Sequence, residues 1–221
     1  MSIAHATRNG YLYSVLTATL RVVFTRLLNP FGTWLARIGV TPNAITVFGT
    51  LGAMAGALVF FTRGWWMTGT LLIWAFVMLD MLDGLVARIS GKSSKFGAVL
   101  DSTCDRFADA AVFATIGWYF ALHGQRWMLL AALLCLVLGA VTSYIRARAE
   151  AAGFTCNVGI AERTDRLIIV LVGTGLTGDP FHIPFVQAIA LWLLVAASTV
   201  TVGQRLASVY QQSKALESAE A

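Results

Sequence analysis

The sequence predicts an all-α integral membrane protein with six transmembrane helices, preceded by an amphipathic helix at the membrane interface. Of its 221 residues, 57% are hydrophobic and 12% are charged, a balance that is too apolar for a soluble domain of this size. Several apolar runs approach the roughly 20 residues that a helix needs to cross a bilayer. The chain contains no internal repeat, so we expect one membrane domain over residues 41–210.

The predicted elements follow in chain order. Residues 1–40 form an interfacial and juxtamembrane part, because residues 11–28 carry leucines at helical spacing with arginines off that stripe. Thr41 is a candidate N-cap and Pro42 suits the first helical position. The polar residues 211–221 are expected to form a flexible cytoplasmic tail. The six spans are expected at Pro42–Thr62, Trp65–Ala87, Ala98–Leu122, Trp127–Ile145, Arg166–Leu176 and Pro184–Leu206.

The basic residues give this topology an orientation. With six spans, 14 of the 16 lysines and arginines fall on one side, and only Arg63 and Arg126 fall on the other. Positive charge is retained on the cytoplasmic side of membrane proteins. We therefore expect a multi-pass protein of the cell membrane with both termini in the cytoplasm. The three cysteines form no CxxC pair, so neither a disulfide framework nor a zinc site is predicted.

Four aspartates stand out in the predicted second and third spans. Asp80 and Asp83 are three residues apart, and Asp101 and Asp105 are four apart, so each pair shares one helical face. Charged groups at the membrane are costly and usually functional. One interpretation is a pair of hard cations bound by carboxylate oxygens, which suit Mg²⁺ or Mn²⁺. The alternative is structural neutralisation by Arg88, Arg106 and the neighbouring lysines.

This segment resembles the signature of the CDP-alcohol phosphotransferase (phosphatidyltransferase) family. The signature reads D-x2-D-G-x2-A-R-x8-G-x3-D-x3-D, and the chain matches it at Asp80, Asp83, Gly84, Ala87, Arg88, Gly97, Asp101 and Asp105. The resemblance implies six transmembrane helices, a homodimer, and two divalent metal ions per active site. It also implies that an alcohol displaces CMP from a CDP-linked donor.

The resemblance further implies roles for individual residues. Asp80, Asp83, Asp101 and Asp105 are expected to be metal ligands, and Asp105 also the general base for the incoming hydroxyl. Asp109, one turn further on, is expected to support them by hydrogen bonding. The residues expected to contact the nucleotide of CDP-diacylglycerol are Asn43, Ala44, Ile45, Thr46, Gly84, Arg88 and Ser94.

Five further arginines are candidates for binding the acceptor alcohol. Arg146, Arg148, Arg163, Arg166 and Arg205 lie at the predicted cytoplasmic ends of the later spans. The guanidinium group binds phosphate oxygens bidentately, so these residues predict an acceptor that already carries a phosphate. The positive-inside bias alone is the simpler explanation for them.

Longer stretches resemble one branch of the family. SYIRARAEAAG, ERTDRLIIVLVGTG, FGAVLDSTCDR and VGQRL are similar to segments of the actinobacterial phosphatidylinositol phosphate synthases. This resemblance implies transfer of the phosphatidyl group from CDP-diacylglycerol to an inositol phosphate at the bilayer surface, and no nucleic-acid partner. The same chemistry with glycerol 3-phosphate is the nearest alternative. An Asp-rich prenyltransferase and a cation transporter are more distant ones.

Overall fold

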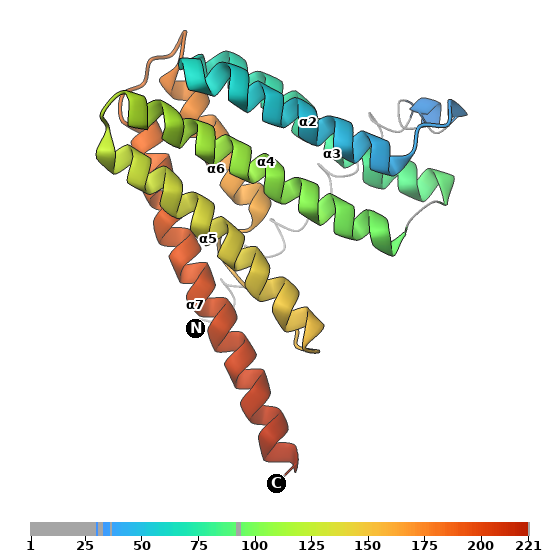
Figure 1. The fold of residues 1–221 in the computed structure, drawn as a ribbon. Coiled ribbons are helices and arrows are strands. Elements are labelled where there is room, and N and C mark those ends of the chain that lie inside the picture. The colour runs from blue at the N-terminus through green and yellow to red at the C-terminus, as the bar shows by residue number, and fades with distance from the viewer. Residues whose placement is uncertain (1–29, 31–32, 36, 92–93, 221) are drawn as a thin grey trace, which may run out of the picture. The chain divides into compact units, whose positions relative to one another are not determined.

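The computed structural model describes residues 30, 33–35, 37–91 and 94–220, and the side chains within these ranges except those of residues 80, 81, 90, 219 and 220. Every regular element in this part of the chain is helical (Figure 1). The amphipathic helix predicted over residues 11–28 lies outside the described residues. The helices are α2 (Pro42–Phe60), the 3-10 turn η1 (Phe61–Arg63), α3 (Trp66–Ser90), α4 (Lys95–Leu122), α5 (Arg126–Ala151), α6 (Arg163–Thr177) and α7 (Val186–Glu220).

Each of the six predicted spans overlaps one of the helices α2 to α7. Thr41 acts as the predicted N-cap of α2, since its Oγ1 accepts a hydrogen bond from the amide of Ala44 at 3.3 Å. Several helices extend beyond the predicted ends. α5 continues six residues past Ile145 to Ala151, because the hydropathy pattern ends at the edge of the apolar run while Arg, Ala and Glu still favour helix.

Four of these helices are long and apolar enough to cross a bilayer: Pro42–Arg63, Trp66–Ile89, Arg126–Ala151 and Val186–Ser218. α4 and α6 do not meet the same criteria. α4 carries three aspartates, Asp101, Asp105 and Asp109, and α6 has 15 residues. The described helices therefore make this an integral membrane protein by length and composition.

The chain divides into two compact units. The first comprises residues 1–49 and 78–101, and the second comprises residues 50–77 and 102–221. In the first unit, Ile45 of α2 packs with Leu82, Leu85 and Val86 of α3. This small cluster fixes the register between α2 and the part of α3 that carries the first half of the aspartate signature.

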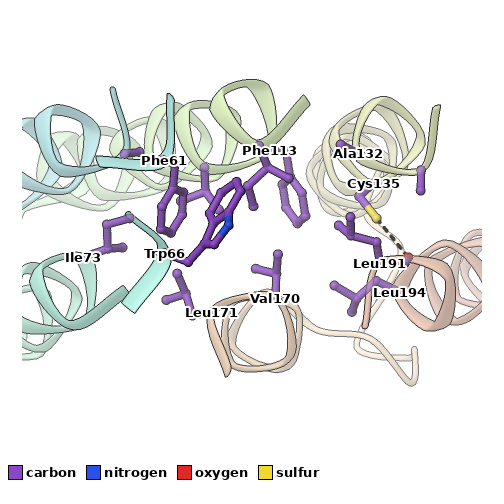
Figure 2. Packing of buried hydrophobic residues seen from close by; sticks show 14 of the residues in the cluster. Phe61, Trp66, Ile73, Phe113, Ala132, Cys135, Val170, Leu171, Leu191 and Leu194 are labelled. Atoms are coloured by element: carbon purple, nitrogen blue, oxygen red, sulfur yellow. Dashed lines mark hydrogen bonds between the residues drawn. The ribbon is translucent and has the colours of Figure 1, made fainter. Parts of the chain in front are cut away.

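The second unit has a larger apolar core. Figure 2 shows side chains from each of its helices meeting there, with Phe61 and Trp66 beside Phe113. The rings of Phe61 and Trp66 lie 5.6 Å apart between centroids. The Sγ of Cys135 donates a hydrogen bond to the carbonyl of Leu191 across the α5–α7 contact (Figure 2). In lipid, such packing stabilises helix association through van der Waals contact and interhelical hydrogen bonds.

α7 is longer than the sequence predicted. It continues through residues 211–220, which were expected to form a flexible tail. The amide of Gln212 is hydrogen-bonded to the backbone of Thr155 at 2.7 and 2.9 Å, and these contacts give this last part of the helix a partner. The flexibility of residues 211–221 stays a prediction.

A pair of glycine substitutions tests the close contact between α6 and α7. A Cβ on Gly173 would lie 2.5 Å from the Cβ of Ala190, so Gly173→Ala should destabilise the second unit by roughly 1–3 kcal/mol through overpacking. A Cβ on Gly203 meets no described atom within 4 Å, and Gly203→Ala should leave stability unchanged or raise it by up to about 1 kcal/mol. Thermal unfolding in detergent measures both, and an equal or higher melting temperature for Gly173→Ala would contradict the packing.

Candidate active site

The first half of the signature lies in the first unit. Asp83 is half-buried in α3, and its Oδ2 accepts a short hydrogen bond from the hydroxyl of Thr46 in α2. Thr46 is itself buried, with 4% of its surface exposed. This contact orients the carboxylate of Asp83. The side chain of Asp80 lies outside the described part.

The residues predicted to contact the nucleotide are also in the first unit. Gly84 is exposed, and a Cβ built on it meets no described atom within 4 Å, so a ligand can approach the backbone there. The Nε of Arg88 donates to the carbonyl of Gly84 at 3.0 Å, which places the guanidinium beside this open surface. Ile45 points into the apolar cluster, so its side chain is not available to a ligand.

Asn43 and Ser94 meet at Gly97. The hydroxyl of Ser94 accepts a hydrogen bond from the amide of Gly97 at 2.9 Å. A Cβ on Gly97 would lie 3.1 Å from both the Oδ1 of Asn43 and the Oγ of Ser94. A larger residue at position 97 would press on these two polar side chains, both of which are predicted to contact the nucleotide.

The predicted metal ligands divide between the units. Asp83 and Asp101 belong to the first, whereas Asp105 belongs to the second. Among the side chains that the structure describes, which leave out Asp80, no three His, Cys, Asp or Glu residues gather closely enough to hold a metal ion. The donor set itself is made of carboxylates, which is the chemistry that Mg²⁺ and Mn²⁺ prefer. The metal site therefore stays a prediction.

Ion pairs join α4 to α6 in the second unit. The Nη1 of Arg163 lies 2.6 Å from Oδ1 of Asp105, and its Nε lies 3.4 Å from Oδ1 of Asp109. Asp109 also pairs through Oδ2 with Nη2 of Arg166 at 3.3 Å. Arg106 approaches Asp105 at 3.5 Å. Part of the charge of Asp105 is thus neutralised by Arg163 and Arg106, of which the alternative interpretation of the aspartates named only Arg106.

Arg166 and Arg205 are buried, with 3% and 5% of their surfaces exposed. Arg166 donates to the hydroxyl of Thr142 and to the carbonyl of Ala161, both at 3.3 Å. Arg205 donates to the carbonyl of Thr142 and, at 2.9 Å, to that of Val158. Buried guanidinium groups need such partners, because an unpaired charge away from water is costly.

A cavity of about 390 Å³ opens beside this network. It is lined by Ser102, Asp105, Arg106, Ser143, Arg146, Ala147, Glu150, Glu162, Arg163, Thr164, Arg166 and Arg205. Five arginines and three carboxylates give it an excess of two positive charges. The lining therefore suits a dianionic group such as a phosphate monoester.

The structure brings together four of the five arginines predicted to bind the acceptor. Arg146, Arg163, Arg166 and Arg205 line the cavity. Arg148 is exposed and is not among its lining residues. Two residues along a helix correspond to a rotation of about 200°, so Arg146 and Arg148 face opposite sides of α5.

Three participants were not predicted from the sequence. Thr142 accepts hydrogen bonds from both buried arginines, whereas Glu150 and Glu162 add carboxylates to the cavity wall. Glu150 could have been found, since it lies four residues after Arg146 and pairs with it at 2.9 Å. Glu162 and Asp165 form a capping box at the start of α6, but Glu-x-x-Asp differs from the usual Ser/Thr-x-x-Glu/Gln pattern of such a box. The predicted supporting role of Asp109 agrees with its hydrogen bonds to Arg163 and Arg166.

Comparison with known proteins identifies the family to which this arrangement belongs. Residues 39–202 match the model of the CDP-alcohol phosphatidyltransferase family. The phosphatidylinositol phosphate synthase of Mycobacterium marinum is 47% identical over 192 residues, which cover 86% of this chain and 82% of the relative.

Two solved structures of the phosphatidylinositol phosphate synthase of Mycobacterium tuberculosis are similar to this fold. The one with CDP-DAG bound has a TM-score of 0.81 at 45% identity, over 84% of this chain and 94% of that one. The one with manganese and citrate has a TM-score of 0.79 at 45% identity, over 82% and 88%. On the match of the family model and these relatives, the chain belongs to the CDP-alcohol phosphatidyltransferase family.

Proposed function

We propose that this protein is a phosphatidyltransferase of phospholipid biosynthesis that uses CDP-diacylglycerol as donor and 1D-myo-inositol 3-phosphate as acceptor. Its products are phosphatidylinositol phosphate and CMP. The observation that carries the proposal is the arginine-lined cavity beside Asp105, with its excess of two positive charges. An acceptor that already bears a phosphate matches that charge, whereas an uncharged alcohol leaves it uncompensated.

The choice between acceptor phosphates rests on the relatives. The proteins that match most of this chain are named phosphatidylinositol phosphate synthases, which favours inositol phosphate over glycerol 3-phosphate. Arg146, Arg163, Arg166 and Arg205 form the proposed phosphate site. Arg148 is left out because its exposed side chain faces away from the cavity.

The donor is assigned to the first unit. Gly84 offers an open backbone surface with the guanidinium of Arg88 beside it, and Asn43 and Ser94 add polar groups next to Gly97. Together with Ala44, Ile45 and Thr46 these residues are the proposed nucleotide site. Ala44 and Ile45 contribute through their backbone, because the side chain of Ile45 is buried.

Asp80, Asp83, Asp101 and Asp105 would hold two divalent ions, Mg²⁺ or Mn²⁺. A relative solved with manganese and citrate and the carboxylate donors support this assignment. Such ions would offset the negative charge of the donor pyrophosphate during displacement.

The proposed reaction is a displacement at the donor pyrophosphate. The acceptor hydroxyl attacks the phosphorus next to diacylglycerol, a new P–O bond forms, and the P–O bond to CMP breaks. Asp105 accepts the proton of the hydroxyl. Its pairing with Arg163 at 2.6 Å orients the carboxylate toward the cavity, and a carboxylate in such a pair is expected to accept the proton late in the reaction. The arginines fix the acceptor phosphate away from the attacking hydroxyl.

We further infer that the chain has six transmembrane spans. Two of them would be α4 and α6, which length and composition alone do not identify as spans. Six spans place the basic loops on the cytoplasmic side of the cell membrane, where water-soluble inositol phosphate is available. Family membership supports a homodimer.

The acceptor is tested by incubating the purified protein with CDP-diacylglycerol and either labelled inositol 3-phosphate or labelled glycerol 3-phosphate. Lipid-soluble label and CMP should appear with inositol phosphate and not with glycerol phosphate. A chelator should abolish the product, and added Mg²⁺ or Mn²⁺ should restore it. Product from glycerol 3-phosphate and none from inositol phosphate would replace the proposed acceptor.

Arg146 and Arg148 form a matched pair on α5. Arg146→Ala should raise the KM for inositol phosphate by roughly 10- to 100-fold, because a charged hydrogen bond to phosphate contributes about 1.5–3 kcal/mol. Stability should hardly change, since its pair with Glu150 is exposed. Arg148→Ala should leave KM near the wild-type value. Steady-state kinetics at saturating CDP-diacylglycerol measure both, and equal effects would refute the assigned orientation.

Asp105→Asn tests the proton acceptor. The amide keeps the size of the side chain but accepts no proton, so kcat should fall by at least about 100-fold. Asp179→Asn is the control, because Asp179 lies in the α6–α7 connection with 88% of its side chain exposed. Turnover is compared at equal amounts of folded protein, judged by gel filtration and thermal unfolding. Wild-type turnover in Asp105→Asn would remove Asp105 from the mechanism.

A further inference from the structure

The connection between α5 and α6 leads directly into the arginines of the cavity. Residues 152–162 form no helix or strand, and Arg163 is the first residue of α6. The backbone amides and carbonyls of such a segment need partners from side chains or water. The partners that it finds determine how firmly the start of α6 is held.

Side chains of α7 supply these partners. The hydroxyl of Thr201 accepts a hydrogen bond from the amide of Ala161 at 3.1 Å. The Nε of Arg205 donates to the carbonyl of Val158 at 2.9 Å. Thr201, Arg205 and Gln212 follow one another at intervals of four and seven residues, so they share one face of the helix.

Gln212 binds the segment through both ends of its amide. Its Oε1 accepts from the backbone amide of Thr155 at 2.9 Å, and its Nε2 donates to the carbonyl of the same residue at 2.7 Å. This pair reproduces the two hydrogen bonds that opposed residues exchange in an antiparallel sheet. The carbonyl and hydroxyl of Ser208 accept from the same Nε2 at 3.2 Å each, which fixes the orientation of the amide.

The segment lies close against its neighbours along this contact. Cys156 and Ala161 are 0% and 1% exposed. A Cβ on Gly159, whose φ is +140°, would lie 2.5 Å from the Cγ2 of Thr201, so the backbone passes where no side chain fits. The segment is therefore bound at residues 155, 158 and 161. Ala161 lies only two residues before Arg163.

We propose that Gln212 is a positioning residue for the acceptor site, and that the C-terminal part of α7 holds the α5–α6 connection so that Arg163 faces the cavity. This inference rests on the proposed function, because it assigns Gln212 to the binding of inositol phosphate. Gln212 is not among the residues that line the cavity, so it acts through the loop. Arg205 takes part both in the cavity lining and in holding the loop, since it lines the cavity and donates to the carbonyl of Val158.

The neighbouring Gln211 provides a control of the same residue type. Gln211 is exposed, whereas Gln212 is half-buried. Gln212→Ala removes both hydrogen bonds to the backbone of Thr155. Gln212→Glu keeps an acceptor for the amide and loses the donor to the carbonyl. Thr155→Ala removes the hydroxyl contact to Gln212 at 3.1 Å and leaves the two backbone bonds in place.

Steady-state kinetics should separate these variants by the KM for inositol phosphate. Gln212→Ala should raise it roughly 5- to 30-fold, Gln212→Glu at least as much because a carboxylate oxygen then faces the carbonyl of Thr155, and Gln211→Ala and Thr155→Ala by no more than about twofold. The KM for CDP-diacylglycerol and kcat should stay within about twofold of wild type. Hydrogen exchange in a peptide covering residues 152–162 should accelerate in Gln212→Ala and not in Gln211→Ala.

The outcomes distinguish this inference from the proposed function. Active wild-type protein together with an unchanged KM for inositol phosphate in Gln212→Ala overturns the role of Gln212 alone. A parallel loss of kcat and of affinity for both substrates, with a lower melting temperature, also overturns it, because that pattern indicates general destabilisation. Wild-type protein that does not transfer to inositol phosphate overturns the proposed function and this inference with it.

Discussion

The ion pairs between α4 and α6 are the interaction on which the arginine-lined cavity, the proposed acceptor site, depends. The two carboxylate oxygens of Asp109 pair with Arg163 and Arg166. Arg166 is buried, with only 3% of its surface exposed. A guanidinium in such surroundings is stable only when a carboxylate and hydrogen-bond acceptors accompany it. The fold therefore holds a cluster of arginines in place, and the cavity that they line has more positive than negative side chains.

The same contacts serve packing and chemistry. Thr142 binds Arg166 through its hydroxyl and Arg205 through its carbonyl, so one turn of α5 connects the arginines of two other helices. Between helices in lipid, polar contacts of this kind replace much of the stabilisation that apolar burial provides in water. In the proposed phosphate site, arginines already held by these contacts would lose less freedom on binding a ligand, which lowers the entropic cost.

Much of the fold and part of the site could be predicted from single-residue patterns. The apolar runs located the helices α2 to α7 of the described part of the chain, because length and hydropathy are properties of consecutive residues. The signature correctly indicated that Asp83 lies next to the open backbone at Gly84, because the two residues are consecutive in one helix. Arg148 shows the limit of this approach. Its charge and position in the sequence matched those of Arg146, yet the helix turns it to the opposite side, and a grouping by charge alone overlooked that rotation.

By itself, the sequence determined the helices, the order of the charged residues and the family signature, because these depend on local spacing and composition. The tertiary structure decided which of those charges meet. Asp109 lies 57 residues from Arg166, and Thr155 lies 57 residues from Gln212. Such pairs form only when α4, α6 and α7 pack in a particular register, and that register is set by close contacts such as Gly173 against Ala190, which a pattern of hydrophobicity does not specify.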